Sequence, residues 1–333
     1  MKVSEVGEFG LIEILAKMIE TSLDVKRPSW KNMVAGIGDD AAAWRNTGEI
    51  TLATTDCLVQ DVHFKMGQAA WSDLGWKALA VNLSDIAAMG GTAEYALVTL
   101  GLPSDTEVEH VTELYKGMLE LGEQFGVAIA GGNITSSNTV FVSLTVTGSS
   151  DNRLLKRSAA KPGDLIGVTG YPGAAAAGLR LISNGSASTA EDTPLRQAFL
   201  RPCPRLAEGT IIQAAGGRAA IDISDGLVAD LGHICRASKV GARIEAERIP
   251  LHPAALKAFP SQALDMALGG GEDYELLFTA SAAIIDKVKA KTSLPVSVIG
   301  EITASSPGVV HTVDAKGRLH KFDKARWNHF GKG

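Results

Sequence analysis

The chain has few cysteines, and it has no long apolar run. Its three cysteines, Cys57, Cys203 and Cys235, are far apart and lack the paired spacing of a zinc site. An odd and scattered set also argues against a disulfide framework, so we expect free thiols in a reducing, cytoplasmic environment. No apolar run is long enough to span a bilayer, and residues 1–15 lack the apolar core of a signal peptide. We therefore expect no membrane partner.

Basic clusters and aromatic residues are also scarce. Lys and Arg are scattered, the formal net charge is −5, and aromatic residues make up only 5% of the chain. Such a chain has no basic field that would recruit nucleic acid, which we do not expect as a partner. Glycine, by contrast, is abundant at 36 residues and predicts many tight turns. An anionic ligand would need bound cations for part of its neutralisation.

The composition that remains is typical of a globular protein with helices and strands in alternation. Hydrophobic residues make up 45% and charged residues 21% of 333 residues, which suits two domains of ordinary size. Apolar spacing predicts helices over 74–88 and 107–125, and strands over 50–55 and 95–102. This alternation predicts a mixed α/β fold.

A change in residue composition near residue 150 predicts the boundary between the two domains. The polar segment 151–153 precedes Arg157-Ser-Ala-Ala-Lys-Pro-Gly-Asp164, which leads into a new predicted strand over 165–169. We therefore predict domains over 1–150 and 151–333.

Acidic residues recur beside glycine or at the ends of predicted elements. The clearest stretch is Gly36-Ile-Gly-Asp-Asp40, and the set comprises Asp39, Asp40, Asp56, Asp85, Asp222, Asp225, Glu272 and Asp273. One such acid is typical of an ordinary turn. A series of them predicts a hard-cation site, because Mg²⁺ prefers carboxylate oxygens and bridges to substrate phosphates. Asp56 is predicted at the end of strand 50–55, where it would face a cleft.

Two further stretches allow more than one interpretation. Asn82 and Asp85 share a face of helix 74–88, either as an exposed polar stripe or as functional residues. The glycine-rich stretch Gly170–Gly178 enters a helix and could hold phosphate. Its alanines more simply allow close helix packing, which is the interpretation we favour.

Several common site types are missing from the sequence. There is no Gly-x-x-x-x-Gly-Lys-Ser/Thr loop and no protein-kinase motif set, and His63 belongs to no His-Glu-x-x-His pattern. Elimination together with the acidic series favours a magnesium-dependent enzyme that acts on polyphosphate.

Five motifs also match a known family. They are Gly36-Ile-Gly-Asp-Asp40, Thr54-Thr-Asp56, Asn82-Leu-Ser-Asp-Ile-Ala-Ala-Met-Gly90, Ile223-Ser-Asp-Gly226 and Gly270-Gly-Glu-Asp-Tyr-Glu-Leu276. With them the chain resembles the thiamine-monophosphate kinases, in the superfamily that includes the aminoimidazole ribonucleotide synthetases. The last motif is the most particular to these kinases.

The resemblance implies an N-terminal mixed sheet with helices that dimerises through its strands, and a C-terminal α/β domain that completes the active site. It implies a homodimer that transfers the γ-phosphoryl group of ATP to thiamine monophosphate, the last step of thiamine diphosphate biosynthesis. ATP would be the co-substrate and several Mg²⁺ ions the cofactors. Direct in-line transfer needs positioning and charge neutralisation, and no covalent intermediate.

The resemblance also implies roles for individual residues. The magnesium ligands would be Asp40, Thr54, Thr55, Asp56, Asp85, Asn133, Asp222 and Asp225, with Asp39 as a supporting neighbour. The ATP contacts would be Tyr115, Gly132, Asn133, Arg157 and Ser224. The thiamine monophosphate contacts would be His63, Glu272 and Trp327.

One departure from the family pattern concerns a metal ligand. The usual Gly-Gly-Asp-Thr-Thr appears here as Gly131-Gly-Asn-Ile-Thr135. Because the amide oxygen of Asn133 lacks the charge of a carboxylate, we predict weaker binding of one metal ion. Two alternatives stay open: another ATP-dependent enzyme of the superfamily, or a non-catalytic protein that binds nucleotide or thiamine phosphate.

Overall fold

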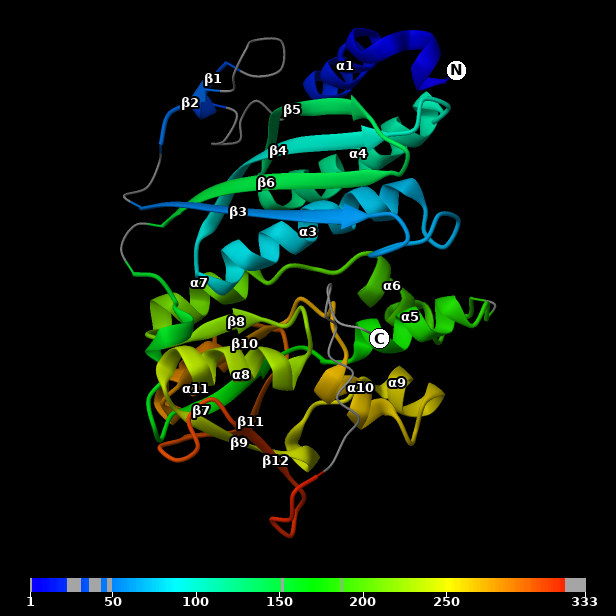
Figure 1. Cartoon of the computed structure of the whole chain (residues 1–333). Helices are drawn as coiled ribbons and strands as arrows, with labels where there is room; N and C mark the ends of the chain where they lie inside the picture. The colour runs from blue at the N-terminus through cyan, green and yellow to red at the C-terminus, as the bar shows by residue number, and fades with distance from the viewer. Residues whose placement is uncertain are drawn as a thin grey trace. The chain divides into compact units, whose positions relative to one another are not determined.

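The computed structural model describes residues 2–22, 31–35, 43–46, 50–150, 153–186 and 188–320. The chain divides into two compact units, each of which is described by itself (Figure 1). The first unit comprises Met1–Ile86 and Gly91–Asn152, and the second comprises Ala87–Gly90 and Arg153–Gly333. Asp39, Asp40 and Trp327 lie outside the described residues.

The first unit is built on a four-stranded sheet in the order β3-β6-β4-β5. The strands are β3 (Ile50–Val59), β6 (Phe141–Ser150), β4 (Thr92–Leu102) and β5 (Ala128–Ser136). Neighbours pair antiparallel except β4 and β5, which are parallel. A short antiparallel pair, β1 (Met33–Ala35) and β2 (Ala43–Trp44), adds Trp44, which stacks on Tyr95 of β4.

The helices of this unit are α1 (Val3–Ser22), α3 (Trp71–Ala88) and α4 (Val108–Phe125). Glycines let α3 and α4 approach closely, because a Cβ at Gly75 would lie 1.8 Å from the carbonyl oxygen of Leu114. On β3, Leu52 and Leu58 are buried whereas Thr51 and Thr55 are exposed, so one face of the strand meets the core. Between Leu52 and Leu58 on the same strand, Thr54 is half-buried and Asp56 is exposed.

The second unit is built on a six-stranded sheet in the order β12-β9-β11-β7-β10-β8. The strands are β7 (Leu165–Thr169), β8 (Ala220–Asp222), β9 (Gly241–Glu245), β10 (Leu276–Ala280), β11 (Val296–Thr303) and β12 (Val310–Val313). Within this sheet β12 pairs parallel with β9, and the other neighbouring strands pair antiparallel.

Seven helices belong to the described part of this unit: α5 (Ala174–Ser183), α6 (Thr193–Leu200), α7 (Leu206–Ala215), α8 (Leu227–Ser238), α9 (Pro253–Ala258), α10 (Ala263–Gly269) and α11 (Ala282–Lys289). Leu227, Leu231 and Ile234 of α8 share the buried core with Ile221 of β8 and Leu277 of β10. This packing fixes α8, and the loop before it, against the sheet.

The mixed α/β class is confirmed, but one predicted strand end is wrong. The strand expected over 50–55 continues to Val59, because β3 pairs with β6 residue by residue from Ile50 to Val59. Asp56 therefore lies inside the strand rather than at its end. Within the described residues, no helix is both long enough and apolar enough to cross a bilayer.

Candidate active site

Three of the predicted metal ligands lie together in the first unit. Thr54 and Asp56 are two residues apart on β3, so their side chains share a face of the strand. The Thr54 hydroxyl donates a hydrogen bond of 2.5 Å to Oδ2 of Asp85 on α3. Desolvation by the surrounding protein, and then the charge of Asp85, raise the pKa of the Asp56 carboxyl to about 6.

These groups fit a magnesium ion. The available donors are carboxylate and hydroxyl oxygens, which are the ligands that Mg²⁺ prefers. Burial is the larger cause of the raised pKa of Asp56, and the charge of Asp85 adds to it. A bound cation relieves such repulsion between two acids. Thr54, Asp56 and Asp85 together are called the carboxylate pair with its threonine: the pair is Asp56 and Asp85, and the threonine is Thr54.

The Thr55 side chain lies on the opposite face of β3. Its hydroxyl donates to the carbonyl oxygen of Leu144 at 2.9 Å and accepts from the Thr145 hydroxyl at 3.3 Å. A role for Thr55 at the same metal ion would have to come from its main-chain carbonyl.

The other predicted residues of the first unit are spread over three elements. Gly132 and the exposed Asn133 lie on β5, where a Cβ at Gly132 would be 1.8 Å from the carbonyl oxygen of Val98. Tyr115 is buried on α4, and this burial raises the pKa of its hydroxyl. His63 is half-buried after β3, where its Nδ1 accepts from the Val59 amide at 3.0 Å.

In the second unit, two motifs that are distant in sequence lie side by side. The Glu272 amide donates to the Ser224 carbonyl at 2.8 Å, and the Tyr274 amide donates to the Ile223 carbonyl at 2.9 Å. The Ile223 amide in turn donates to the Glu275 carbonyl at 2.8 Å. The loop after β8 and the stretch before β10 therefore form one small ladder, which carries the predicted ATP contact Ser224 and the predicted substrate contact Glu272.

The backbone of this ladder is strained. Glu272 and Tyr274 have φ values of 67° and 53°, in the left-handed region that residues with side chains rarely adopt. Gly271 is needed beside them, because a Cβ there would lie 2.4 Å from the Ser224 carbonyl oxygen. Such strain clusters at functional sites and persists only where surrounding contacts hold it.

Asp273 is one of these holding contacts. Its carboxylate accepts hydrogen bonds from the amides of Gly173, at 2.7 Å, and Ala175, at 3.0 Å, at the start of α5. Burial, as the largest cause, raises its pKa to about 8. This internal carboxyl group occupies the amides that a phosphate would use, which supports packing as the role of Gly170–Gly178.

Glu275 is a second holding contact. Arg205 donates to both of its oxygens, at 2.6 and 2.8 Å, and the Thr169 hydroxyl donates at 2.6 Å. The Glu275 side chain is 8% exposed and that of Arg205 is 20% exposed. Arg205 could not be named from the sequence, because a lone arginine gives no signal of its distant partner.

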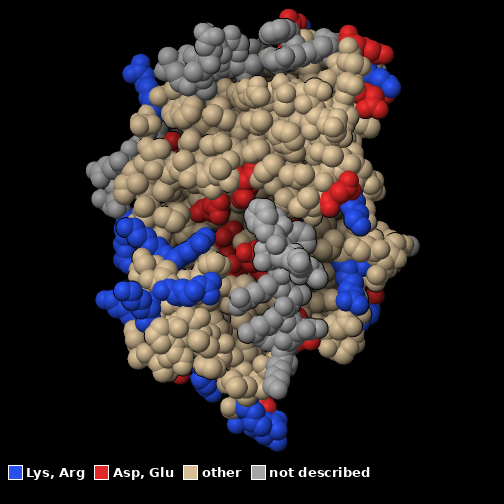
Figure 2. All heavy atoms as spheres, in the orientation of Figure 1, with Lys and Arg blue, Asp and Glu red and all other residues tan. Residues whose placement is uncertain are grey.

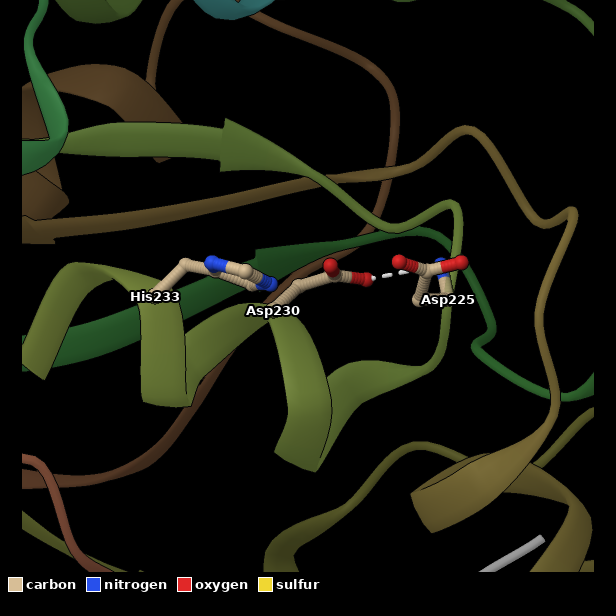
Figure 3. A group of neighbouring side chains, drawn as sticks. All are labelled: Asp225, Asp230 and His233. Carbon is tan, nitrogen blue, oxygen red and sulfur yellow. Dashed lines mark hydrogen bonds between the residues drawn. The ribbon is translucent and has the colours of Figure 1, made fainter. Parts of the chain in front are cut away.

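Asp230 was missed as well. It lies in the first turn of α8 and is 2% exposed, and Figure 3 shows it between His233 and Asp225. Ligand-type atoms of these three residues lie within 4.8 Å of one another. One Asp230 oxygen already accepts from the amides of Ser224, Asp225 and Gly226, each at 3.1 Å. We therefore interpret Asp230 as an internal acceptor; its position four residues after Gly226 was the available signal.

The remaining predicted residues of this unit differ in exposure. Asp222, at the end of β8, is 4% exposed, whereas Asp225 and Arg157 are exposed. Figure 2 shows Lys and Arg side chains gathered toward the left of the view, with acidic side chains nearer its centre. The visible face therefore offers both signs of charge.

Comparison with known proteins defines the class. The model of the AIR synthase related protein N-terminal domain matches residues 38–150, and that of the C-terminal domain matches residues 161–312. The chain therefore belongs to the AIR synthase related proteins.

Full-length relatives define the family within this class. The chain is 38% identical to thiamine-monophosphate kinase of Escherichia coli K12, over 94% of this chain and 98% of that protein. It is 35% identical to thiamine-monophosphate kinase of Bacillus subtilis, over 89% and 93%. It belongs to the thiamine-monophosphate kinase family, as the motifs indicated.

Solved structures of thiamine-monophosphate kinases have a similar fold. The thiamine-monophosphate kinase of Stenotrophomonas maltophilia K279a has a TM-score of 0.82 at 35% identity, over 92% of this chain and 96% of that chain. The structure described as AaThiL complexed with AMPPCP and TMP has a TM-score of 0.76 at 33% identity, over 99% of both chains.

Proposed function

We propose that this chain transfers the γ-phosphoryl group of ATP to thiamine monophosphate, giving thiamine diphosphate and ADP. The family carries this name, and one member was solved with AMPPCP and TMP. The observation that carries the proposal is the carboxylate pair with its threonine, Thr54, Asp56 and Asp85. Two anionic phosphates must meet in line, and acids that hold divalent cations are the means of relieving their repulsion.

The proposed magnesium ligands are the residues that the motifs supply. They are Asp40, Thr54, Thr55 through its carbonyl, Asp56, Asp85, Asn133, Asp222 and Asp225. Bound magnesium would neutralise phosphate charge. The Thr54 hydroxyl fixes one oxygen of Asp85 by its hydrogen bond, which orients that carboxylate toward β3.

The proposed contacts to the two substrates include neighbours in the second unit. Ser224, for ATP, and Glu272, for thiamine monophosphate, are joined by the 2.8 Å bond between the Glu272 amide and the Ser224 carbonyl. This adjacency supports donor and acceptor phosphates being held close together. The further ATP contacts proposed are Tyr115, Gly132, Asn133 and Arg157, and the further thiamine monophosphate contacts are His63 and Trp327.

The direct test incubates the protein with ATP, MgCl₂ and thiamine monophosphate and follows thiamine diphosphate by chromatography. We expect product only when all three are present, and loss of product when EDTA is added. ATP binding without product would favour the non-catalytic alternative. ATP turnover with a different phosphorylated acceptor only would favour another enzyme of the superfamily.

We also propose a homodimer that forms through the first-unit sheet and works in the cytoplasm. On the face of β3 and β6 opposite the core, Thr51, Ala53 and Thr145 are uncharged and exposed or half-exposed. Introducing a charge there by Ala53→Arg should convert a dimer to a folded monomer in analytical ultracentrifugation. A monomeric wild-type protein would contradict the proposal. The free state of Cys57, Cys203 and Cys235 supports a reducing compartment.

A further inference from the structure

The loop between β8 and α8 directs three consecutive main-chain amides at one carboxylate oxygen. The amides of Ser224, Asp225 and Gly226 each donate to Oδ2 of Asp230 at 3.1 Å. Figure 3 shows the Asp230 side chain reaching back from α8 to the Asp225 amide. Successive amides that converge in this way form a nest, a concavity that binds anions in many proteins.

Here the group that fills the nest is a side chain of the protein itself. Because Asp230 is 2% exposed and engages all three amides, the loop cannot offer them to a phosphate. The groups that Ser224 and Asp225 then offer a ligand include the Ser224 hydroxyl and the Asp225 carboxylate. This arrangement is the opposite of a glycine-rich phosphate loop, in which the amides themselves hold the ligand.

The loop is held on its other side as well. The Ser224 carbonyl accepts from the Glu272 amide at 2.8 Å. Gly226 has a φ of 119° and lies against Gly269, whose carbonyl oxygen would be 2.9 Å from a Cβ on Gly226. Asp230 therefore supplies the hydrogen bonds that hold the amide side of a loop whose opposite side is fixed by the Glu272 stretch.

We propose that Asp230 is a positioning residue for the phosphoryl transfer proposed above. Its carboxylate fills the nest of Ser224, Asp225 and Gly226 and holds the loop so that the Ser224 hydroxyl and the Asp225 carboxylate face the nucleotide and its metal ion. The inference rests on the proposed function, and it adds a residue that contacts neither substrate.

The test compares D230A, D230N and the matched control D314A. Asp314 also accepts two main-chain amides, those of Lys316 and Arg318, each at 2.9 Å, in a turn of the same unit. We expect D230A to raise the KM for ATP about tenfold, equivalent to about 1.4 kcal/mol, with a smaller change in kcat. D230N keeps an acceptor oxygen and should stay within about threefold of wild type. D314A should lose thermal stability but keep the wild-type KM.

Formate gives a readout that a purely structural role would not move. As a small carboxylate, it can enter the emptied nest, so added formate should lower the KM of D230A toward the wild-type value. It should leave wild type and D314A unchanged. If D230A does not fold, D230S takes its place, because its shorter side chain also withdraws the acceptor from the three amides.

Three results would overturn the inference: a wild-type KM for ATP in D230A, no effect of formate on its raised KM, or a D230N variant as impaired as D230A. Direct measurement of ATP affinity with MgCl₂ present separates this inference from the proposed function. If wild type makes no thiamine diphosphate, the proposed function fails. The affinity shift of D230A and its reversal by formate still decide the role of Asp230.

Discussion

The acids of the two units look alike in sequence but have different surroundings. In the first unit, burial and then the charge of Asp85 raise the pKa of Asp56, and the Thr54 hydroxyl of β3 donates a hydrogen bond to Asp85. In the second unit, Asp230 and Asp273 accept main-chain amides, and Glu275 accepts from Arg205. An acid close to another acid favours a cation, whereas an acid at converging amides or an arginine serves as an internal hydrogen-bond acceptor.

Because of this difference, substitution of an acid should have different effects in the two units. In the first unit, loss of Asp56 or Asp85 should reduce activity and leave the free energy of unfolding largely unchanged, because these acids are held for a ligand. At Asp230, Asp273 and Glu275 of the second unit, removing the acid should first harm the fold, because each of these acids accepts from donors that would otherwise lose their partner. Four substitutions test this contrast.

The largest effect is expected from Asp85→Asn. Loss of one carboxylate should reduce turnover by roughly 10³-fold, since metal-based charge stabilisation contributes several kcal/mol. The unfolding free energy of the metal-free protein should rise by about 0.5–1 kcal/mol, because repulsion with Asp56 is relieved. Turnover assays and urea denaturation check both. The exposed D105N is the matched control and should change neither; a large stability loss in D85N would contradict the contrast.

Next in size is Glu275→Ala, which leaves the guanidinium of Arg205 without its buried partner. Breaking a buried pair in this way costs about 3–5 kcal/mol, and we expect a loss of about 3 kcal/mol in urea denaturation. The double variant R205M/E275L should recover most of this loss, because both charges are gone. An E275A protein as stable as wild type would show that Glu275 does not hold the ladder.

Asp273→Asn should change how stability depends on pH. The native pKa of about 8 lies above the usual value for Asp, so between about pH 4 and 8 the native state holds a proton that the unfolded state has released. Wild type should therefore lose stability as pH rises, by about 1 kcal/mol per unit between pH 5 and 7. The pH dependence of the free energy of unfolding of D273N should lack this contribution. The same pH dependence in D273N and wild type would show that Asp273 does not hold a proton in the native state.

The smallest effect is expected from Asn133→Asp. A carboxylate at this exposed position of β5 should lower the magnesium concentration for half-maximal activity by about threefold, or about 0.7 kcal/mol. N138D adds the same charge at another exposed position, beyond β5, and should have no such effect. An unchanged magnesium requirement in N133D would remove Asn133 from the metal site.

The sequence predicted the helices and strands better than it predicted the hydrogen-bond partners of the side chains. Helix 107–125 and strand 165–169 match α4 and β7 closely, because a long apolar stripe and a short β-branched run mark them clearly. Strand 50–55 was cut short at Asp56, because a polar residue resembles a strand end when the pairing with β6 is unknown.

The same holds for the candidate site: its acids could be predicted from the sequence, and the hydrogen-bond donors around them could not. The motif acids Asp56, Asp85 and Asp222 could be named from sequence, because they recur beside other motif residues. The partners of Asp230, Asp273 and Glu275 could not, since a main-chain amide has no sequence signature and Arg205 is 70 residues from Glu275. Only folding brings those donors to the acids, and the donors decide whether an acid is available to a ligand.

The most direct measurement of the contrast is the rise in melting temperature caused by MgCl₂ in wild type, D85N and D273N. We expect a clear rise in wild type, the same rise in D273N from its own starting value, and a much smaller rise in D85N. A full magnesium effect in D85N would contradict the central claim that the acids of the first unit, and not the internal acid Asp273 of the second, are held for a cation.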